Sequence, residues 1–400
     1  MKTFIGIGIL ALMLGCTAKN GQETDLYTTL MALSDLPSDE ERSNRVNAIW
    51  DSLKTEGQIP FRQDSTVLFL YRGEAESVHW NGDFNSWSGA DQVKNKGMRI
   101  EGTDVWVLKT TFPSDARLDY KITVNEEEWI LDPSNPLQQW SGFGPNSELR
   151  MPDWQPEVLK EPIPDAPKGT LTEYQVIESA SMGYAIQYQV YTPAGYGSSD
   201  THAVLYIADG QEYGDPKLGN VPIMLDNLIY LNRIEQVIAV FVSPLNPDDE
   251  TQNRRADEFR TNPDYLQFYV DELIPHIDSN FNTKPEAEHR GILGTSFGGL
   301  NATYFAFTRP DVFGKAAIQA PAYWYNEDIF EMVEDSPAEQ PVLFMSVGTQ
   351  FDGMENTRRM KAIFDRKAYS LTYMEVNEGH SWGAWSAQAD DLLIALFGIN

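Results

Sequence analysis

The sequence predicts two folded units: an all-β unit with a sandwich architecture, followed by an α/β unit with a mostly parallel sheet flanked by helices. Short runs with a period of two and Asn/Gly turns fill residues 61–151, which is typical of a β-sandwich. After a proline-rich segment, apolar strands alternate with helical stretches over residues 170–400. This alternation indicates parallel strands that are buried on both faces.

The composition suits a globular protein and argues against several classes of partner. The chain has 400 residues, of which 42% are hydrophobic, and a formal net charge of −29. A polyanionic surface repels phosphates, and no basic run offsets it, so we expect no nucleic-acid partner. No cluster of His, Cys and Asp has the spacing of metal ligands, so the sequence predicts no metal and no other cofactor.

The chain begins like an exported protein. A basic start is followed by the apolar run Phe4–Leu14, which is too short to span a bilayer as a stable anchor. The run ends in Leu-Met-Leu-Gly-Cys16, which resembles the bacterial lipobox. The resemblance implies that residues 1–15 are a signal peptide and that a lipid on Cys16 anchors the protein in the cell envelope, on its periplasmic or outer face. The alternative is that Cys16 is an ordinary apolar residue of the signal.

The N-terminal third divides into three predicted segments. Residues 16–60 form a tether and a short helix, because Pro37–Leu53 combines helix-start residues with apolar residues at helical spacing. Residues 61–151 form the sandwich, which we expect to be immunoglobulin-like, with strands at Val67–Tyr71, Ser77–Trp80, Val105–Thr111, Leu118–Val124 and Glu128–Leu131. Residues 152–169 are rich in proline and form an extended linker.

One stretch of the second unit carries the chemistry. Gly294-Thr-Ser296-Phe297-Gly298 fits G-x-S-x-G between a buried run and a helix-like segment. A serine on a tight strand-to-helix turn needs small neighbours, and the two glycines supply that room. The turn exposes the hydroxyl of Ser296 and leaves the N–H near Phe297 free to hold a developing oxyanion. The stretch therefore predicts a nucleophile elbow.

The surrounding pattern predicts an α/β-hydrolase fold with the elbow on the fifth strand. Strands are expected at Glu173–Ile177, Ala185–Tyr191, Ala203–Ala208, Val237–Val242, Gly291–Leu293, Ala316–Gln319, Val342–Val347 and Leu371–Val376. Helices are expected over Asp264–Phe281 and Asn356–Arg366.

A serine nucleophile needs a histidine base and a carboxylate that orients the base. In this fold the acid follows a strand downstream of the elbow, and the histidine follows the last strand. Asp352 and His380 occupy those places, and His380 is the only histidine after the elbow. Glu355 and Glu378 are nearby carboxylates that could orient His380 instead.

Six motifs connect residues 170–400 with a known family: Ala208-Asp-Gly210-Gln211, Arg255-x-x-Glu258-Phe259, Glu272-Leu-Ile-Pro275, Gly294-Thr-Ser-Phe-Gly298, Gly348-Thr349 and Gly379-His-Ser-Trp382-x-x-Trp385. With them the chain resembles the esterase D-type α/β-hydrolases, and among these the enterochelin (ferric siderophore) esterases and the bacterial feruloyl and acetyl-xylan esterases. The resemblance implies that the loop at Gln211 supplies a second oxyanion donor beside Phe297. Where the family often has Ser-Gly-Ser, this chain has Ala-Pro-Ala at 320–322.

The N-terminal unit shows a second resemblance. Trp80–Trp87 and Asp132–Pro136 resemble the early-set, carbohydrate-module-48-like domains that are fused to glycan-active enzymes. A related domain also precedes the catalytic domain in enterochelin esterases. The unit is therefore compatible with both a siderophore and a glycan substrate.

Three further residues are candidates for substrate contact. Tyr323 and Trp324 fall at the expected mouth of the active site. Arg255 either pairs with Glu258 or binds an anionic group of the substrate.

The sequence therefore predicts a serine carboxylic-ester hydrolase of the cell envelope that works through an acyl-enzyme. Its expected substrate is a small-molecule ester of the siderophore type or a glycan-linked ester. Three alternatives remain: a feruloyl or acetyl-xylan esterase of polysaccharide breakdown, an acyltransferase on the same triad, and a non-catalytic lipoprotein that binds a glycan or siderophore.

Overall fold

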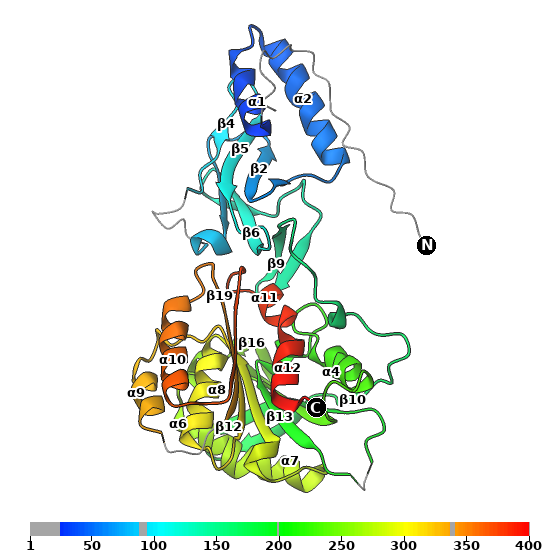
Figure 1. The fold of residues 1–400 in the computed structure, drawn as a ribbon, viewed down its shortest axis with the longest axis vertical. Coiled ribbons are helices and arrows are strands. Elements are labelled where there is room, and N and C mark those ends of the chain that lie inside the picture. The colour runs from blue at the N-terminus through cyan, green and yellow to red at the C-terminus, as the bar shows by residue number, and fades with distance from the viewer. Residues whose placement is uncertain (1–24, 88–93, 198–199, 337–340, 400) are drawn as a thin grey trace.

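The computed structural model describes residues 25–87, 94–197, 200–336 and 341–399. The chain forms two units, and the N-terminal one sits on one end of a larger α/β unit (Figure 1). The predicted signal peptide and Cys16 lie outside the described residues. Within the described ranges, none of the helices has the length and apolar character needed to cross a membrane.

Two antiparallel sheets and two helices make up the N-terminal unit. One sheet has the order β1-β2-β5-β4, and the other has the order β3-β6-β9-β8, with β7 paired to β6. The elements are α1 (Leu26–Ala32), α2 (Asp39–Thr55), β1 (Phe61–Gln63), β2 (Thr66–Arg72), β3 (Val78–Gly82), β4 (Met98–Arg99), β5 (Val105–Thr111), β6 (Arg117–Val124), β7 (Glu128–Ile130), β8 (Gln138–Ser141) and β9 (Gly144–Arg150), with the short 3₁₀ turns η1 (Leu33–Asp35) and η2 (Asp83–Asn85).

Side-chain alternation along β2 explains how this unit packs. Val67 and Phe69 point into an apolar cluster that they share with Trp80 of the other sheet. Leu68 and Leu70 point to the opposite face, where α1 and α2 cover them. The two sheets thus pack face to face, as expected of a sandwich, and the immunoglobulin-like assignment stays a prediction. Strands β1, β4, β8 and β9 were not predicted, because β1 and β4 are very short and the sequences of β8 and β9 are mostly polar.

A nine-stranded sheet forms the centre of the second unit, in the order β10-β12-β14-β13-β17-β18-β19-β20, with β11 paired to β12. Strands β14, β13, β17, β18, β19 and β20 are parallel to one another. Strands β10 and β11 pair with β12, and β12 pairs with β14, in antiparallel fashion. Their bounds are β10 (Thr170–Leu171), β11 (Gln175–Ser179), β12 (Tyr184–Thr192), β13 (Ala203–Ala208), β14 (Val237–Ser243), β17 (Arg290–Thr295), β18 (Lys315–Gln319), β19 (Val342–Gly348) and β20 (Leu371–Val376). All eight predicted strands are present, and β10 is added.

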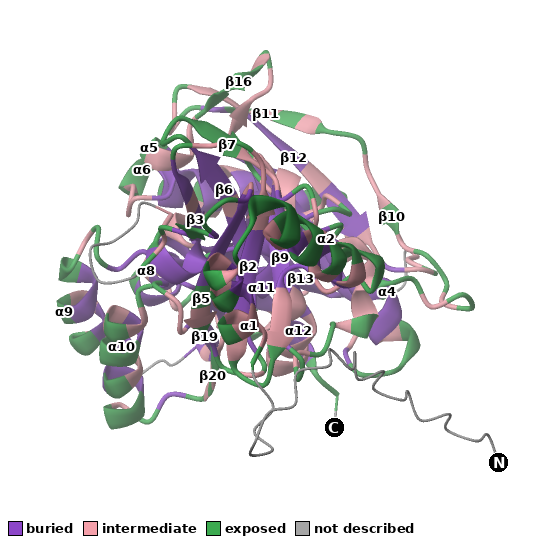
Figure 2. Ribbon diagram, turned by 90° about the horizontal axis from the view of Figure 1, so that it is seen from above, coloured by how far each residue is buried: buried purple, intermediate pink, exposed green. Residues whose placement is uncertain are grey.

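Helices cover both faces of this sheet. One apolar cluster lies under α6 to α10, and the other lies under α4, α11 and α12. In Figure 2 buried residues concentrate on the central strands, while α9 and α10 carry exposed residues on their outer sides. The remaining elements are α3 (Gly210–Tyr213), α4 (Val221–Tyr230), β15 (Leu245–Asn246), β16 (Asp249–Asn253), α5 (Arg255–Glu258), α6 (Pro263–Gln267), η4 (Phe268–Leu273), α7 (Ile274–Asn280), η5 (Ala287–His289), α8 (Phe297–Thr308), α9 (Asp328–Glu334), α10 (Met354–Arg366), α11 (Trp382–Ala387) and α12 (Ala389–Phe397).

The proline-rich segment is fastened to the second unit. It contains the short turn η3 (Val158–Lys160). The side-chain amide of Asn227, on α4, donates to the carbonyls of Leu159 and Glu161, both at 2.8 Å. Its oxygen accepts the N–H of Ile163 at 3.0 Å. The segment is therefore extended, as predicted, and it is also held along the surface of α4.

Candidate active site

Ser296 lies on a strained turn between β17 and α8. Its φ of 58° and ψ of −117° fall outside the regions that L-residues normally occupy. Gly294 makes the turn possible, since a Cβ there would lie 2.2 Å from the carbonyl oxygen of Gly298. The N–H of Ser296 donates to the carbonyl of Gln319 at 2.9 Å and fixes the turn against β18. The structure thus contains the predicted elbow.

His380 and Asp352 come from two neighbouring loops. Asp352 follows β19 and His380 follows β20, and these strands are parallel neighbours. The Nδ1 of His380 contacts Oδ1 of Asp352, whose Oδ2 accepts the N–H of Gly348 at 2.6 Å. The Asp352 carboxylate is buried, while 42% of the His380 side chain is exposed. A carboxylate on Nδ1 orients the ring and leaves Nε2 on its far side for a substrate proton.

The two competing carboxylates are placed differently. Glu378 is buried and turns away from His380 toward Arg117 and Trp154, with contacts of 3.4 Å to each. Glu355 is exposed in the first turn of α10. Of the three candidates, Asp352 is the one in contact with the imidazole.

A pocket of about 370 Å³ brings the predicted catalytic residues together. It is lined by Asp83, Ser86, Trp87, Ser296, Ala320, Pro321, Trp324, Gln350, Phe351, Asp352, Gly353 and His380. Another pocket, of about 400 Å³ beside Arg62, Arg150 and Trp154, contains no predicted catalytic residue. We therefore place the candidate site in the smaller pocket.

Three residues of this pocket belong to the N-terminal unit: Asp83, Ser86 and Trp87. Sequence reasoning placed the Trp80–Trp87 stretch in the sandwich and missed its part in the site. The stretch forms a shaped turn, in which Asn85 accepts from the N–H of Gly82 and donates to the carbonyl of Trp80. The compact Asn-Gly-Asp-Phe-Asn pattern was a signal for a turn, but nothing in it shows which surface the turn meets.

The two predicted oxyanion donors both follow strands that end at the same edge of the sheet. Phe297 is the first residue of α8, where a main-chain N–H lacks an acceptor within the helix. Gln211 lies in α3, directly after β13, and β13 is the parallel neighbour of β17. The tight backbone at this point depends on Gly210, because a Cβ there would lie 2.3 Å from the backbone of Phe241.

The two adjacent aromatic candidates, Tyr323 and Trp324, differ in their exposure to the pocket. Trp324 is 62% exposed and lines the pocket. Tyr323 is fully buried, and its hydroxyl lies 2.8 Å from that of Thr303. The prediction that Tyr323 contacts substrate is therefore wrong: it turns inward to satisfy a buried polar group, and it packs against Phe330.

Arg255 also has a different role from the predicted ones. Its Nε donates to both carboxylate oxygens of Asp209, at 2.8 and 2.9 Å, and its Nη2 donates to the carbonyl of Thr295 at 3.0 Å. Arg255 thereby links the α3 loop to the strand before Ser296, and it does not line the pocket. Both expectations, the pairing with Glu258 and the substrate contact, are corrected by this arrangement.

Glu258 is instead buried against Tyr184, whose hydroxyl donates to it at 3.0 Å. Burial raises the pKa of Glu258 from its ordinary value of 4.5 to about 8. The folded protein therefore keeps a proton that the unfolded chain releases. The stability from this proton is full below pH 4.5 and is lost as the pH rises through about 8.

Glu258→Gln should remove this dependence. Between about pH 5 and 8 we expect the variant to gain stability over the wild type by about 1 kcal/mol per pH unit. Urea unfolding at a series of pH values measures this difference. Glu250→Gln, at an exposed position, is the control and should leave the pH profile unchanged. Parallel profiles for Glu258→Gln and the wild type would contradict the prediction.

Among the residues that the structure describes, no group of three or more His, Cys, Asp or Glu side chains is arranged to hold a metal ion.

The mixed sheet, the strained elbow and the pocket at the carboxyl ends of its parallel strands define an α/β-hydrolase fold. Residues 179–396 match the family described as "Putative esterase". Because this match covers more than half of the chain, the protein belongs to this esterase family.

Similar proteins include two curated enzymes. The chain is 31% identical over 162 residues to an endo-1,4-beta-xylanase/feruloyl esterase of Xylanibacter ruminicola; this match covers 38% of the chain and only 22% of the relative. It is 24% identical over 256 residues to an iron(III) enterobactin esterase of Escherichia coli, covering 57% of the chain and 60% of the relative. The chain thus spans less than two thirds of the length of either enzyme.

A solved structure extends the likeness in fold. The enterobactin esterase of Shigella flexneri, crystallised in the presence of enterobactin, has a TM-score of 0.69 and 21% identity. The match covers 84% of this chain and 94% of that structure. The 84% of this chain that is covered exceeds the fraction that residues 170–400 make up, so the similarity in fold extends into the N-terminal unit.

Proposed function

We propose that the protein is a serine carboxylic-ester hydrolase that works through an acyl-enzyme. The observation that carries this proposal is the shared pocket of Ser296, His380 and Asp352, in which the serine sits on a strained elbow and a buried carboxylate contacts Nδ1 of the histidine. Membership of an esterase family supports it independently.

In this mechanism the Oγ of Ser296 attacks the ester carbonyl while Nε2 of His380 takes the hydroxyl proton. The carboxylate of Asp352 stabilises the imidazolium. The oxyanion of the tetrahedral intermediate receives hydrogen bonds from the N–H groups of Phe297 and Gln211. His380 then gives its proton to the leaving alcohol, and water repeats the sequence on the acyl-enzyme to release the acid.

The pocket favours a substrate with a flat ring. Trp87, Trp324 and Phe351 line it, and both Trp324 and Phe351 are at least half exposed. Exposed aromatic rings stack on aryl or sugar rings. Relatives named for enterobactin and for feruloyl esters act on compounds that carry phenolic rings. We therefore infer a phenolic ester, either of the siderophore type or linked to a glycan.

We also propose that the protein is exported and anchored through a lipid on Cys16. This proposal rests on the apolar run and the lipobox-like sequence at the start of the chain. Mass spectrometry of the N-terminal peptide from membranes of the producing cell would detect the lipid, and an unmodified Cys16 in the mature protein would contradict it.

A competition digest tests the function. The purified protein receives a ferric tricatecholate lactone, a feruloylated oligosaccharide and acetylated xylan together, and mass spectrometry identifies the products. Dihydroxybenzoylserine would identify a siderophore esterase, whereas ferulate or acetate would identify an enzyme of polysaccharide breakdown. Ser296→Ala is the control, and a product that this variant forms at the wild-type rate would refute the proposed mechanism.

Trp324→Ala should separate binding of the ring from the chemistry. We expect KM for a feruloyl ester to rise about 10-fold, because a stacking surface is lost, while kcat for p-nitrophenyl acetate changes little. Steady-state kinetics on both esters measure the effect. Trp129→Ala removes an exposed indole outside the pocket and should change neither value. An unchanged KM in Trp324→Ala would exclude Trp324 from the binding surface.

A further inference from the structure

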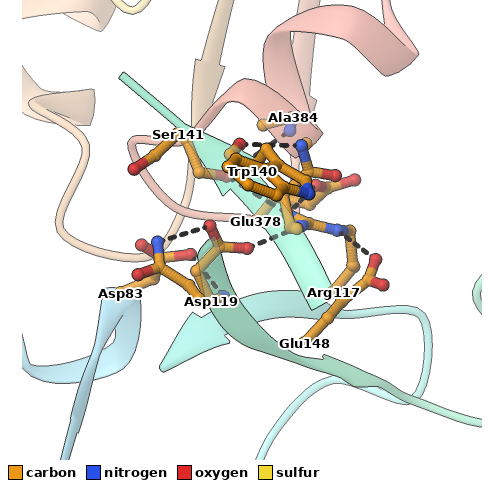
Figure 3. A network of polar contacts seen from close by, with 12 residues as sticks. Asp83, Arg117, Asp119, Trp140, Ser141, Glu148, Glu378 and Ala384 are labelled. Carbon is orange, nitrogen blue, oxygen red and sulfur yellow. Dashed lines mark hydrogen bonds and ion pairs between the residues drawn. The ribbon is translucent and has the colours of Figure 1, made fainter. Parts of the chain in front are cut away.

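A buried arginine of the N-terminal unit lies against the loop that carries His380. Arg117 begins β6, and only 1% of its side chain is exposed. Its guanidinium donates to four acceptors: Asp119 Oδ1 at 2.5 Å, Glu148 Oε1 at 2.7 Å, Ser381 Oγ at 3.2 Å and Glu378 Oε2 at 3.4 Å. Figure 3 shows Arg117 between the carboxylates of its own unit and Glu378 of the other. The two acceptors in the second unit flank His380 on either side.

The backbone of this loop also contacts the N-terminal unit. The N–H of Arg117 donates to the carbonyl of Asn377 at 3.2 Å. A Cβ on Gly379 would lie 2.2 Å from the Cβ of Asp83, and one on Gly383 would lie 2.0 Å from the guanidinium of Arg117. Contacts therefore occur immediately before and after His380, at distances that only glycine allows.

The imidazole itself has two partners in the second unit. Its Nδ1 contacts Asp352, and its ring meets Trp385 edge-on with a centroid distance of 4.8 Å. These contacts orient the ring. The loop before His380 is also held within the second unit, where the N–H of Gln350 donates to the carbonyl of Glu378 at 3.1 Å and the hydroxyl of Thr349 donates to Oδ1 of Asn377 at 2.9 Å. Arg117 and Asp83 hold the side of the loop that faces the N-terminal unit.

We propose that Arg117 is a positioning residue for His380, so that the N-terminal unit holds the catalytic base in place over Ser296. This inference rests on the proposed function, because it requires His380 to act as the base. Arg117 does not line the pocket and acts only through Glu378, Ser381 and the main chain.

An arginine suits this role for a physical reason. Its planar guanidinium serves several acceptors in fixed directions, whereas an ammonium group is a single point charge. Removing one partner from a buried ionic network leaves uncompensated charges, here the carboxylates of Asp119 and Glu378, whereas Glu148 keeps its ion pair with Arg150 at 2.8 Å. The loop would then shift to bring Glu378 toward water and would carry His380 with it.

The test compares the full-length wild type with Arg117→Lys, Arg117→Met and a matched control. Arg290→Met is the control, because Arg290 is also buried and ion-paired, to Asp278 at 3.2 Å, but lies at the opposite end of β17 from Ser296. Each variant is assayed with p-nitrophenyl acetate, whose small acyl group does not depend on the outer pocket. Thermal unfolding shows which fraction of each variant is folded.

We expect kcat to fall about 10- to 100-fold in Arg117→Met with KM unchanged, since a misplacement of about 1 Å costs up to about 100-fold. Arg117→Lys, which keeps the charge, should lie between this variant and the wild type. The low-field proton NMR signal of the hydrogen bond between His380 and Asp352 should shift in Arg117→Met. Arg290→Met should lower the melting temperature but keep both kcat and that signal.

Two results would overturn the inference: a folded Arg117 variant with the kcat and NMR signal of the wild type, or an equal loss of kcat per folded molecule in Arg290→Met. Failure of the proposed function looks different. In that case the wild type itself would neither hydrolyse p-nitrophenyl acetate nor label with a fluorophosphonate on Ser296, and this inference would fall with it.

Discussion

Ser296→Ala is expected to lower kcat for ester hydrolysis by about 10⁵- to 10⁶-fold, because the variant has no nucleophile with which to form the acyl-enzyme. Assays with p-nitrophenyl acetate and labelling with a fluorophosphonate measure the two consequences, loss of turnover and loss of the covalent adduct. The fold should persist, since a methyl side chain fits wherever the serine side chain does.

Ser279→Ala is the matched control, because Ser279 is exposed on α7, far along the chain from the elbow. It should keep full turnover and full labelling. Continued hydrolysis or labelling in Ser296→Ala would show that another residue supplies the nucleophile.

The second large effect is expected for Asp352→Asn, with a fall in kcat of about 10⁴-fold. The amide keeps the size of the carboxylate but loses its charge, so it no longer stabilises the imidazolium or holds His380 in the tautomer that takes the serine proton. The pH dependence of kcat in the variant and the wild type measures the change.

Two variants test the competing carboxylates. Glu355→Gln should retain wild-type activity, because Glu355 is exposed on α10. Glu378→Gln should lose at most about 10-fold, through the loop that it shares with Arg117. A loss in Glu378→Gln as large as that in Asp352→Asn would show that the structural assignment of the acid is wrong.

The second unit could be predicted well because its signals are local. Strands such as Ala203–Ala208 are short apolar runs that match burial on both faces, and their observed bounds equal the predicted ones. The elbow depends on glycines within five residues of each other, so Ser296 could be identified directly. Asp352 and His380 followed from the strand order, which fixes the loops that meet at one edge of the sheet.

The missed features depend on contacts between distant segments. Tyr323 and Trp324 are adjacent aromatic residues, and only the packing around Thr303 decides which of them turns inward. Arg255 meets Asp209 rather than Glu258, because α5 presents the two side chains to different neighbours. No periodicity in the sequence shows which face of the N-terminal unit meets the pocket.

The proline-rich segment keeps the two units close together, because most of it is bonded to one unit or the other. Asp153 is still hydrogen-bonded to Ser114 of the N-terminal unit, and Leu159 is already bonded to Asn227 of the second unit. The free tether is therefore only a few residues long. A short tether raises the effective concentration of one unit at the other to roughly millimolar or above. An interface that would be too weak to join two separate proteins can then keep the pocket assembled almost all of the time.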